Sequence, residues 1–268
     1  MDPTIKILRV IPRYAPAWAF GGSVRFSYDL DAALARRGFE ITVCTSDQLD
    51  LHRRVQAGES DTAGVSVRRF PNRSNYLAGR LSWLSYRPVG LQRAIADLAT
   101  RSDLIHVAEA RGPHVSWALA AARAARVPLV WTPLGALADG VGLRRPYRWL
   151  YDVAHATRRQ LMAAGAVVAQ SAHEAQWLER LGARPSQVQL IGLGVDERRF
   201  ADLPPRGAFR KAVGVGPDRT LVLFMGRFHP NKGLDVLLHA VAMARRTHPN
   251  LAAVLAGWRP PSACRPRS

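Results

Sequence analysis

"FMGRFHPNKGLDVLL", residues 224–238, places an apolar strand, a loop and a helix one after another. The loop carries Arg227 and Lys232, each next to a glycine, Gly226 or Gly233. In a parallel α/β fold the carboxyl end of a strand opens toward the ligand crevice, where loops meet anionic groups. A guanidinium forks onto phosphate oxygens, a lysine adds a compact charge, and glycines let the chain turn closely. The loop therefore predicts a diphosphate site; the alternative is two solvated cations on a surface loop.

The rest of the chain repeats the same alternation of short apolar runs and helical periods. Strands are predicted at 5–11, 39–46, 64–70, 102–109, 127–133, 164–171, 219–226 and 251–257. Helices are predicted at 24–38, 91–98, 115–126, 147–163, 172–182, 208–213 and 233–249, with Ser171 as an N-cap. Such alternation is typical of α/β architecture with a parallel, Rossmann-like sheet.

The polar segment "DERRFADLPPRG", residues 196–207, interrupts this alternation with two adjacent prolines. We place a domain boundary there, near residue 203. Residues 1–203 then form a first lobe, which the segment 187–196 closes, and residues 204–257 begin a second lobe. That second part holds about one βαβ unit, which cannot close a sheet of its own. Residues 258–268, "WRPPSACRPRS", have no periodicity and form an irregular tail.

The charge balance is strongly basic, with a formal net charge of +18 on 268 residues. Only three of the 38 basic residues are lysines, and the arginines are scattered along the chain, as a GC-rich coding sequence would produce. No RNA-binding aromatic signature, zinc spacing or basic heptad accompanies the charge, so we expect no nucleic-acid partner. The basic and aromatic segment 143–161 could lie against an anionic membrane surface; the alternative is a solvated helix face.

Targeting and redox signals are weak. No apolar run reaches the roughly 18 residues of a membrane-spanning helix, and the amino terminus lacks a signal-peptide layout. Cys44 lies in an apolar run and Cys264 in the tail, and together they form neither a metal spacing nor a disulfide framework. We expect a cytoplasmic globular protein, with a peripheral position at the inner membrane face as the alternative.

The loop and its neighbours resemble a known family. "GRFHPNKGLDVLLHAVA" followed by "LAAVLAG" is similar to the nucleotide-sugar phosphate loop of retaining family-4 glycosyltransferases, in which a G-R pair precedes K-G by four residues. Residues 21–46 resemble the family's N-terminal G-G loop, helix and second strand. Residues 102–137 resemble the family's middle section. Residues 167–183 resemble its sensor-like strand and helix, and residues 191–200 resemble its inter-lobe hinge. The resemblance runs from about residue 6 to residue 257.

This resemblance implies a GT-B fold of two facing Rossmann-like lobes, with acceptor on the first and activated sugar on the second. It implies sugar transfer with retention from a nucleotide-diphosphate sugar to a glycan, lipid-linked or small-molecule acceptor, without a metal or other cofactor. Arg227 and Lys232 would be catalytic, gripping the donor diphosphate and offsetting charge on the leaving nucleotide. Gly226 and Gly233 would belong to the same phosphate site. Gly21 and Gly22 would bring the first loop near the phosphates; the alternative is a tight loop before a helix.

Two positions depart from the family pattern. Leu134 stands in "WTPLGAL" where members often carry a histidine that faces the transferred sugar, and Leu193 stands where an asparagine is usual. A leucine cannot hydrogen-bond a hydroxyl group. His106, Glu109 and His114 lie on neighbouring strand ends and are candidate replacements for acceptor or sugar contacts; the alternative is a structural role for each.

Length is the larger departure. The family's second lobe continues for about another 130 residues, a size expected of a whole domain, and nothing after Gly257 resembles it. We expect a carboxyl-terminally truncated chain, from a frameshift or as a natural fragment, with impaired transfer. The alternatives are a non-catalytic fragment that binds an acceptor or a membrane surface, and a GT-B sugar-nucleotide epimerase. An oxidoreductase is disfavoured, because the loop after the first predicted strand lacks the G-x-G-x-x-G turn.

Overall fold

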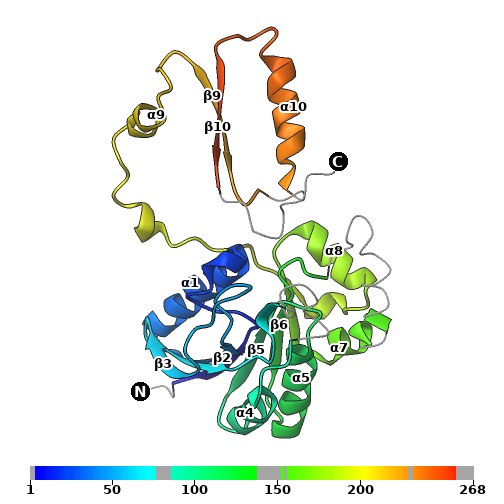
Figure 1. Ribbon diagram of the computed structural model, residues 1–268. Helices are drawn as coiled ribbons and strands as arrows, with labels where there is room; N and C mark the ends of the chain where they lie inside the picture. Colours follow the sequence, from blue (N-terminus) through cyan, green and yellow to red (C-terminus); the bar gives the residue numbers. More distant parts are fainter. Residues whose placement is uncertain (1–3, 77–85, 138–151, 154–155, 229–231, 258–268) are drawn as a thin grey trace. The chain divides into compact units, whose positions relative to one another are not determined.

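The computed structural model describes residues 4–76, 86–137, 152–153, 156–228 and 232–257. It divides the chain into two compact units, Met1–Asp196 and Glu197–Ser268, and we treat each by itself (Figure 1). The domain limits derived from the sequence, with a boundary near residue 203, stay predictions, as do the roles of the two parts.

The first unit is built on one eight-stranded sheet. Its order is β3-β4-β2-β1-β5-β6-β7-β8, and every neighbouring pair is parallel except β3 with β4. The strands are β1 Lys6–Val10, β2 Glu40–Ser46, β3 Gly58–Thr62, β4 Val65–Phe70, β5 Leu104–Ala108, β6 Leu129–Thr132, β7 Ala166–Ala169 and β8 Val188–Leu190. The predicted α/β class with a mostly parallel sheet is confirmed.

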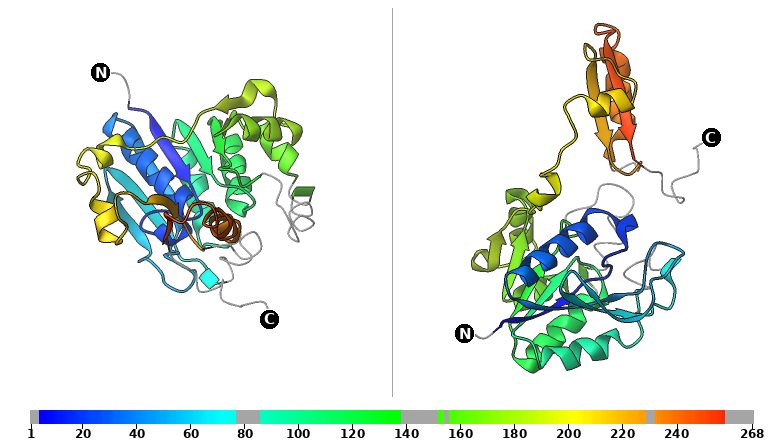
Figure 2. Two further views of the ribbon diagram at one scale, coloured as in Figure 1. Left: turned by 90° about the horizontal axis from the view of Figure 1, so that it is seen from above. Right: turned by 90° about the vertical axis from the view of Figure 1, so that its left-hand side faces the viewer.

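Helices cover both faces of this sheet (Figure 2). Helix α1 (Gly22–Arg36) packs on one face, where Ile7, Ile41 and Val43 form an apolar cluster. Helices α4 (Leu91–Ala99) and α5 (Pro113–Ala125) pack on the other, around a cluster that includes Leu8 and Val107. Neighbouring residues of β1 enter different clusters because successive side chains of a strand point to opposite faces. The described residues of the first unit also form helices α7 (Thr157–Ala163) and α8 (Ala172–Arg180).

Several predicted elements differ in the structure. Strand β3 was not predicted, because its sequence "GESDT" is polar and almost wholly exposed at the sheet edge. The predicted helix 147–163 is not continuous: Ala156 adopts a left-handed conformation with φ 49°, and α7 begins after it. Residues 147–151 and 154–155 of that prediction, and the tail with Cys264, lie outside the described residues. In the closing segment 187–196 only β8 is regular.

The second unit contains one parallel βαβ arrangement, as the sequence predicts. Strands β9 (Thr220–Met225) and β10 (Leu251–Ala256) pair in register from Thr220↔Leu251 to Met225↔Ala256, and α10 (Leu234–Ala244) connects them. A short helix, α9 (Ala208–Ala212), precedes β9. In the described part of this unit the sheet has two strands.

Gly257, at the end of β10, allows that strand to approach the phosphate-loop candidate. A Cβ added at Gly257 would lie 1.8 Å from the carbonyl oxygen of Gly226, which directly precedes Arg227. Because a backbone atom blocks it, we expect Gly257→Ala to destabilise the β9–β10 pair by about 1–3 kcal/mol. Hydrogen exchange of peptides covering residues 220–225 should be faster. Gly216→Ala is the matched control, since a Cβ there meets nothing within 4 Å; equal protection in both variants would contradict the prediction.

Candidate functional site

The first unit has its topological switch point between β1 and β5. From β1 the sheet continues through β2 in one direction and through β5 in the other, so the loops after these two strands diverge. In open α/β sheets, ligands bind in the crevice at the carboxyl ends of strands at such a point. The loops concerned are residues 11–21, after β1, and 109–112, after β5.

Glu109 connects these loops. It directly follows β5, and its Oε1 accepts a hydrogen bond of 2.8 Å from Ser23 Oγ in the first turn of α1. Its Oε2 lies 3.7 Å from Arg13 Nη1 in the loop after β1. Its own backbone is held by β6, because the Glu109 carbonyl accepts from Trp131 Nε1 at 2.7 Å and its N–H donates to Thr132 O at 3.0 Å.

The backbone after β5 is also strained. Glu109 and Arg111 have φ values of 66° and 54°, in the left-handed region that side chains with a Cβ disfavour. Such a conformation costs about 1–2 kcal/mol per residue and persists where the surroundings over-determine it. Arg111 is fixed by Asp152, which its Nη2 meets at 2.8 Å, and by the carbonyls of Ala136 and Leu137. Strain held in this way is common at functional sites.

His114 and His106 occupy different places. His114, in the first turn of α5, is buried, and its Nε2 lies 3.2 Å from the carbonyl oxygen of Ala108. Burial lowers the pKa of His114 to about 4. His106 lies on β5 and meets Thr132 Oγ1 at 2.7 Å; burial, followed by the charge of Arg9, holds its pKa well below the usual range. A small cavity is lined by Glu109 and His114, and His106 is not among its lining residues.

The two glycines before α1 differ in what they require. Gly21 has φ 94° and ψ −145°, a conformation open essentially to glycine alone. Gly22 has no such φ, and a Cβ there would meet nothing within 4 Å. Around this loop, the Arg25 guanidinium stacks 3.9 Å from the Trp18 ring centroid. The backbone conformation therefore requires glycine at position 21, directly before α1, and does not require it at position 22.

The turn after β6 carries the departure at Leu134. Leu134 and Gly135 have φ values of 56° and 71°, and Ala136 N donates to Pro133 O at 3.1 Å, which makes a tight turn. Glu174 of α8 accepts from Gly135 N at 2.7 Å and fixes it. The Leu134 side chain packs against the α1-side apolar cluster. Hydrogen bonds therefore fix the shape of this turn, and the Leu134 side chain contributes to the apolar core.

The predicted phosphate loop lies in the second unit. Gly226 and Arg227 follow β9 directly, and Arg227 is half-buried. Lys232 is exposed, and Gly233, with φ 64°, is the N-cap of α10. Residues 229–231 between them lie outside the described residues. Both cations thus stand where a strand ends and a helix begins, and the helix N-terminus adds its partial positive charge.

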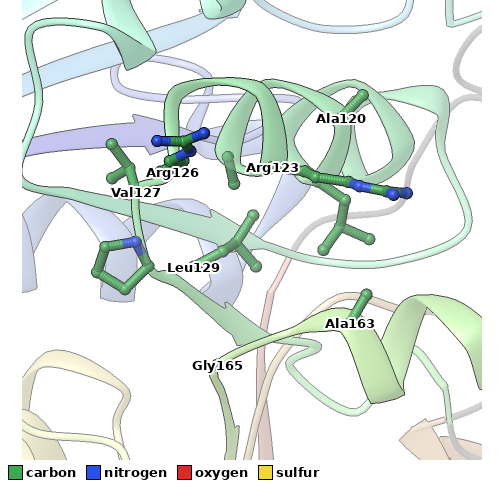
Figure 3. A pocket seen from close by; sticks show the side chains of 10 residues that line it. Ala120, Arg123, Arg126, Val127, Leu129, Ala163 and Gly165 are labelled. Atoms are coloured by element: carbon green, nitrogen blue, oxygen red, sulfur yellow. The ribbon is translucent and has the colours of Figure 1, made fainter.

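A wider hollow, of about 700 Å³, lies elsewhere on the first unit. It is lined mainly by apolar residues with Arg123 and Arg126 from the end of α5, beside Leu129, Ala163 and Gly165 (Figure 3). Leu129 begins β6 and Gly165 precedes β7, so this hollow is at the amino ends of the parallel strands. Ligands of open α/β sheets bind at the opposite ends, and we do not assign the hollow to the candidate site.

Metal ions need clusters of ligand side chains, and a reactive thiol needs surroundings that lower its pKa. The described part of the chain contains no group of three or more His, Cys, Asp or Glu side chains placed to hold a metal ion. Cys44 is buried in the core, and burial raises the pKa of its thiol to about 12. None of the helices that the structure describes is long and apolar enough to span a bilayer.

Several residues of the site carry no clear signal in the sequence. Glu109 has two polar partners, Ser23 and Arg13. Their positions give a weak hint of a site, since Ser23 follows the two glycines and Arg13 follows the first strand. Glu174 and Arg111, which fix the turn after β6, come close to it only through the fold. Tyr86, which lines the small cavity, follows a segment without periodicity.

The sequence matches two family profiles. The profile described as Glycosyltransferase Family 4 matches residues 20–199, and the one described as Glycosyl transferases group 1 matches residues 205–264. Curated relatives include a D-inositol 3-phosphate glycosyltransferase from Kineococcus radiotolerans, 31% identical over 85% of this chain and 53% of that protein. The protein of the same name from Mycolicibacterium gilvum is 30% identical over 88% of this chain and 53% of its own length. The chain thus spans about half the length of these relatives.

Solved structures share the fold. Anabaena HepE in complex with UDP aligns with a TM-score of 0.63 at 20% identity, over 96% of this chain and 62% of that one. Sucrose-phosphate synthase from Thermosynechococcus elongatus aligns with a TM-score of 0.62 at 19% identity, over 96% of this chain and 63% of that one. The α/β fold is GT-B-like, as the resemblance implied.

Proposed function

Because the chain belongs to glycosyltransferase family 4, we propose that it transfers a sugar from a nucleotide-diphosphate sugar to an acceptor hydroxyl, with retention of configuration. The observation that carries the proposal is the placement of Gly226–Arg227 at the carboxyl end of β9 and of Lys232–Gly233 at the start of α10. The UDP and UDP-glucose bound in the HepE structures support a donor of this class.

In this mechanism the acceptor oxygen bonds to the anomeric carbon while the bond from that carbon to the diphosphate oxygen breaks, and the acceptor's proton passes to the departing diphosphate oxygen. Negative charge builds on the leaving nucleotide. Arg227 and Lys232, with the N-terminus of α10, would stabilise that charge, and fixed cations aimed at developing charge lower a barrier effectively. The acceptor would lie in the first unit at the switch point, beside Glu109 and His114. Gly21 and Gly22 would bring the loop before α1 toward the donor phosphates.

Removing either cation should weaken nucleotide binding. A hydrogen bond to a charged group contributes about 1.5–3 kcal/mol, so we expect Arg227→Gln and Lys232→Gln each to weaken UDP binding about tenfold or more. Isothermal titration of the 268-residue chain with UDP measures this directly. Arg245→Gln, which removes an exposed cation at the end of α10, should bind UDP as the parent does. Equal affinities for all four proteins would contradict the assignment.

Transfer itself is tested by incubating the chain with UDP-glucose and hydroxylated acceptors and reading the new anomeric centre by NMR. An α-linked product from the α-linked donor supports retention, and a β-linked product overturns it. UDP binding without transfer to any acceptor would favour the alternative, a fragment that binds ligands without catalysis. A GT-B epimerase would instead change the sugar of the nucleotide donor itself.

We further propose a cytoplasmic location and a peripheral contact with an anionic membrane through residues 143–161; the alternative for this segment is a solvated helix face. Of that segment the structure describes residues 152–153 and 156–161, in which Arg158 and Arg159 are exposed. Exposed arginines on a helix suit anionic headgroups.

A further inference from the structure

A cavity of about 20 Å³ lies under the loop after β5 in the first unit. It is lined by Pro12, Arg13, Tyr86, Glu109, Ala110, Arg111, Gly112 and His114. A cavity of at least about 10–15 Å³ is needed to hold one water molecule. The cavity therefore has room for one oxygen-sized group and is too small for a sugar ring.

Two of the residues that line it, Tyr86 and His114, each carry a buried polar atom without a hydrogen-bond partner in the described residues: the hydroxyl of Tyr86 and Nδ1 of His114. Tyr86 is 2% exposed and His114 is 1% exposed. Their rings meet edge to face with centroids 5.8 Å apart, so each fixes the other. A buried polar group that lacks a hydrogen bond is destabilising, so two such groups on residues that line one cavity are a reason to expect a ligand group or a water there.

The protonation states of the pair define what it can bind. Burial raises the pKa of Tyr86, so its hydroxyl keeps its proton and donates. His114 is neutral near pH 7, with a pKa of about 4. Its Nε2 faces the Ala108 carbonyl, which can only accept, so Nε2 carries the proton and Nδ1 accepts. One donor and one acceptor together match a group that both accepts and donates.

A neutral hydroxyl group fits these conditions, and a phosphate oxygen does not. The dianion of a phosphate monoester has no proton to give Nδ1, and the Glu109 carboxylate, from a residue that lines the cavity, repels any anion. The two guanidiniums nearby are already engaged by carboxylates, Arg13 with Glu109 at 3.7 Å and Arg111 with Asp152 at 2.8 Å. The local charge is therefore balanced before any ligand enters.

We propose that Tyr86 and His114 form a subsite for one hydroxyl group of a polyhydroxylated acceptor, a sugar or cyclitol ring, with an ordered water in its place when no acceptor is bound. This inference rests on the proposed function and names the acceptor chemistry of the same site. The Tyr86 hydroxyl donates to the ligand oxygen, and the ligand hydroxyl donates to His114 Nδ1. Gly112 keeps the room, since a Cβ there would lie 2.6 Å from His114 Nδ1.

The test uses myo-inositol as the probe and the ¹⁵N signal of His114 Nδ1 as the reporter, on the full chain without nucleotide sugar. We expect myo-inositol to shift the Nδ1 signal in a saturable way. Tyr86→Phe should weaken binding about threefold to tenfold, the range for one neutral hydrogen bond. Gly112→Ala, which keeps both polar groups but displaces the ring, should weaken it too. Tyr76→Phe, outside the cavity, should bind as the parent does.

The variants remain informative about folding. Tyr86→Phe removes at most one hydrogen bond to the ordered water, because the hydroxyl has no protein partner in the described residues, so this variant should unfold close to the parent's urea concentration. Binding lost together with stability would indicate a structural role and overturn the proposal, as would unchanged binding by Tyr86→Phe. Inorganic phosphate that shifts the Nδ1 signal with the same saturation would overturn the choice of a hydroxyl. Because no donor is present, this result is independent of the UDP titration, which tests the transferase function.

Discussion

Replacing Asp31 with alanine is expected to destabilise the first unit by about 3–5 kcal/mol. Asp31 of α1 is fully buried, and its Oδ1 lies 2.8 Å from Nε of Arg9 on β1, itself 1% exposed. Removing the carboxylate leaves a guanidinium in the core without its counter-charge, which costs far more than the pair contributes. Urea unfolding followed by hydrogen exchange of β1 and α1 peptides measures the loss in this unit alone.

A double replacement separates the charge from the packing. Arg9→Met with Asp31→Leu removes both ions and fills the volume with apolar atoms, and such exchanges of buried pairs are often neutral or stabilising. We expect most of the stability lost in Asp31→Ala to return. If the double variant is as unstable as the single one, the cost comes from lost volume and the ion pair has no special weight. If Asp31→Ala costs less than about 1 kcal/mol, the pair is unimportant to the fold.

This ion pair also shows where sequence reasoning stops. The periodicity of residues 24–38 predicts an amphipathic helix, and α1 forms there, but Asp31 on its buried side breaks the pattern that periodicity uses. Arg9 likewise stands within an apolar strand. Each is explained only by the other, across 22 residues of chain, and a single sequence contains no measure of such pairing.

The strands were predictable where burial imposes a pattern. The parallel strands of the central sheet coincide with apolar runs such as "IKILRVI" and "FEITVCTS". Both strands of the βαβ unit coincide with apolar runs as well. Strand β3 was missed because an exposed edge strand has no apolar face to leave a trace in the sequence. The interruption at Ala156 was missed because an alanine in the left-handed region gives no warning.

The candidate site, too, has one part with a local sequence pattern and one part without it. Its charged loop, Gly226 to Gly233, can be proposed as a phosphate site from sequence alone, because the strand, the cations, the glycines and the helix follow one another along the chain. For the acceptor side the sequence offers three candidates, His106, Glu109 and His114, which the structure places within β5, directly after β5 and in the first turn of α5. The cavity that joins Glu109 and His114 also needs Tyr86, and its formation depends on a strained loop after β5. Under the proposed function, the acceptor side depends on residues that meet only in three dimensions, whereas the donor side depends on one local loop.

Acid is expected to unfold the first unit through its buried histidines. The pKa of His114 is about 4 in the folded chain and about 6.5 in an unfolded one. Between these values the unfolded chain binds a proton that the folded chain does not, so stability is complete above pH 6.5 and falls as the pH drops toward 4. A difference of this size amounts to about 3 kcal/mol from His114 alone. His106, whose pKa is also lowered by burial, adds to the loss in the same direction.

Urea unfolding of the first unit at intervals from pH 7.5 to pH 4 measures this dependence. Carboxylates titrate in the lower part of the range, so the comparison that isolates the histidine is between variants. His114→Gln should lower stability at pH 7.5 yet show a shallower fall toward acid, because one of the proton-binding groups is gone. His173→Gln, at an exposed position on α8, should keep the slope of the parent. The prediction is wrong if the parent and His114→Gln lose stability in parallel between pH 6.5 and pH 5, since the pKa of His114 would then be the same in the folded and the unfolded chain.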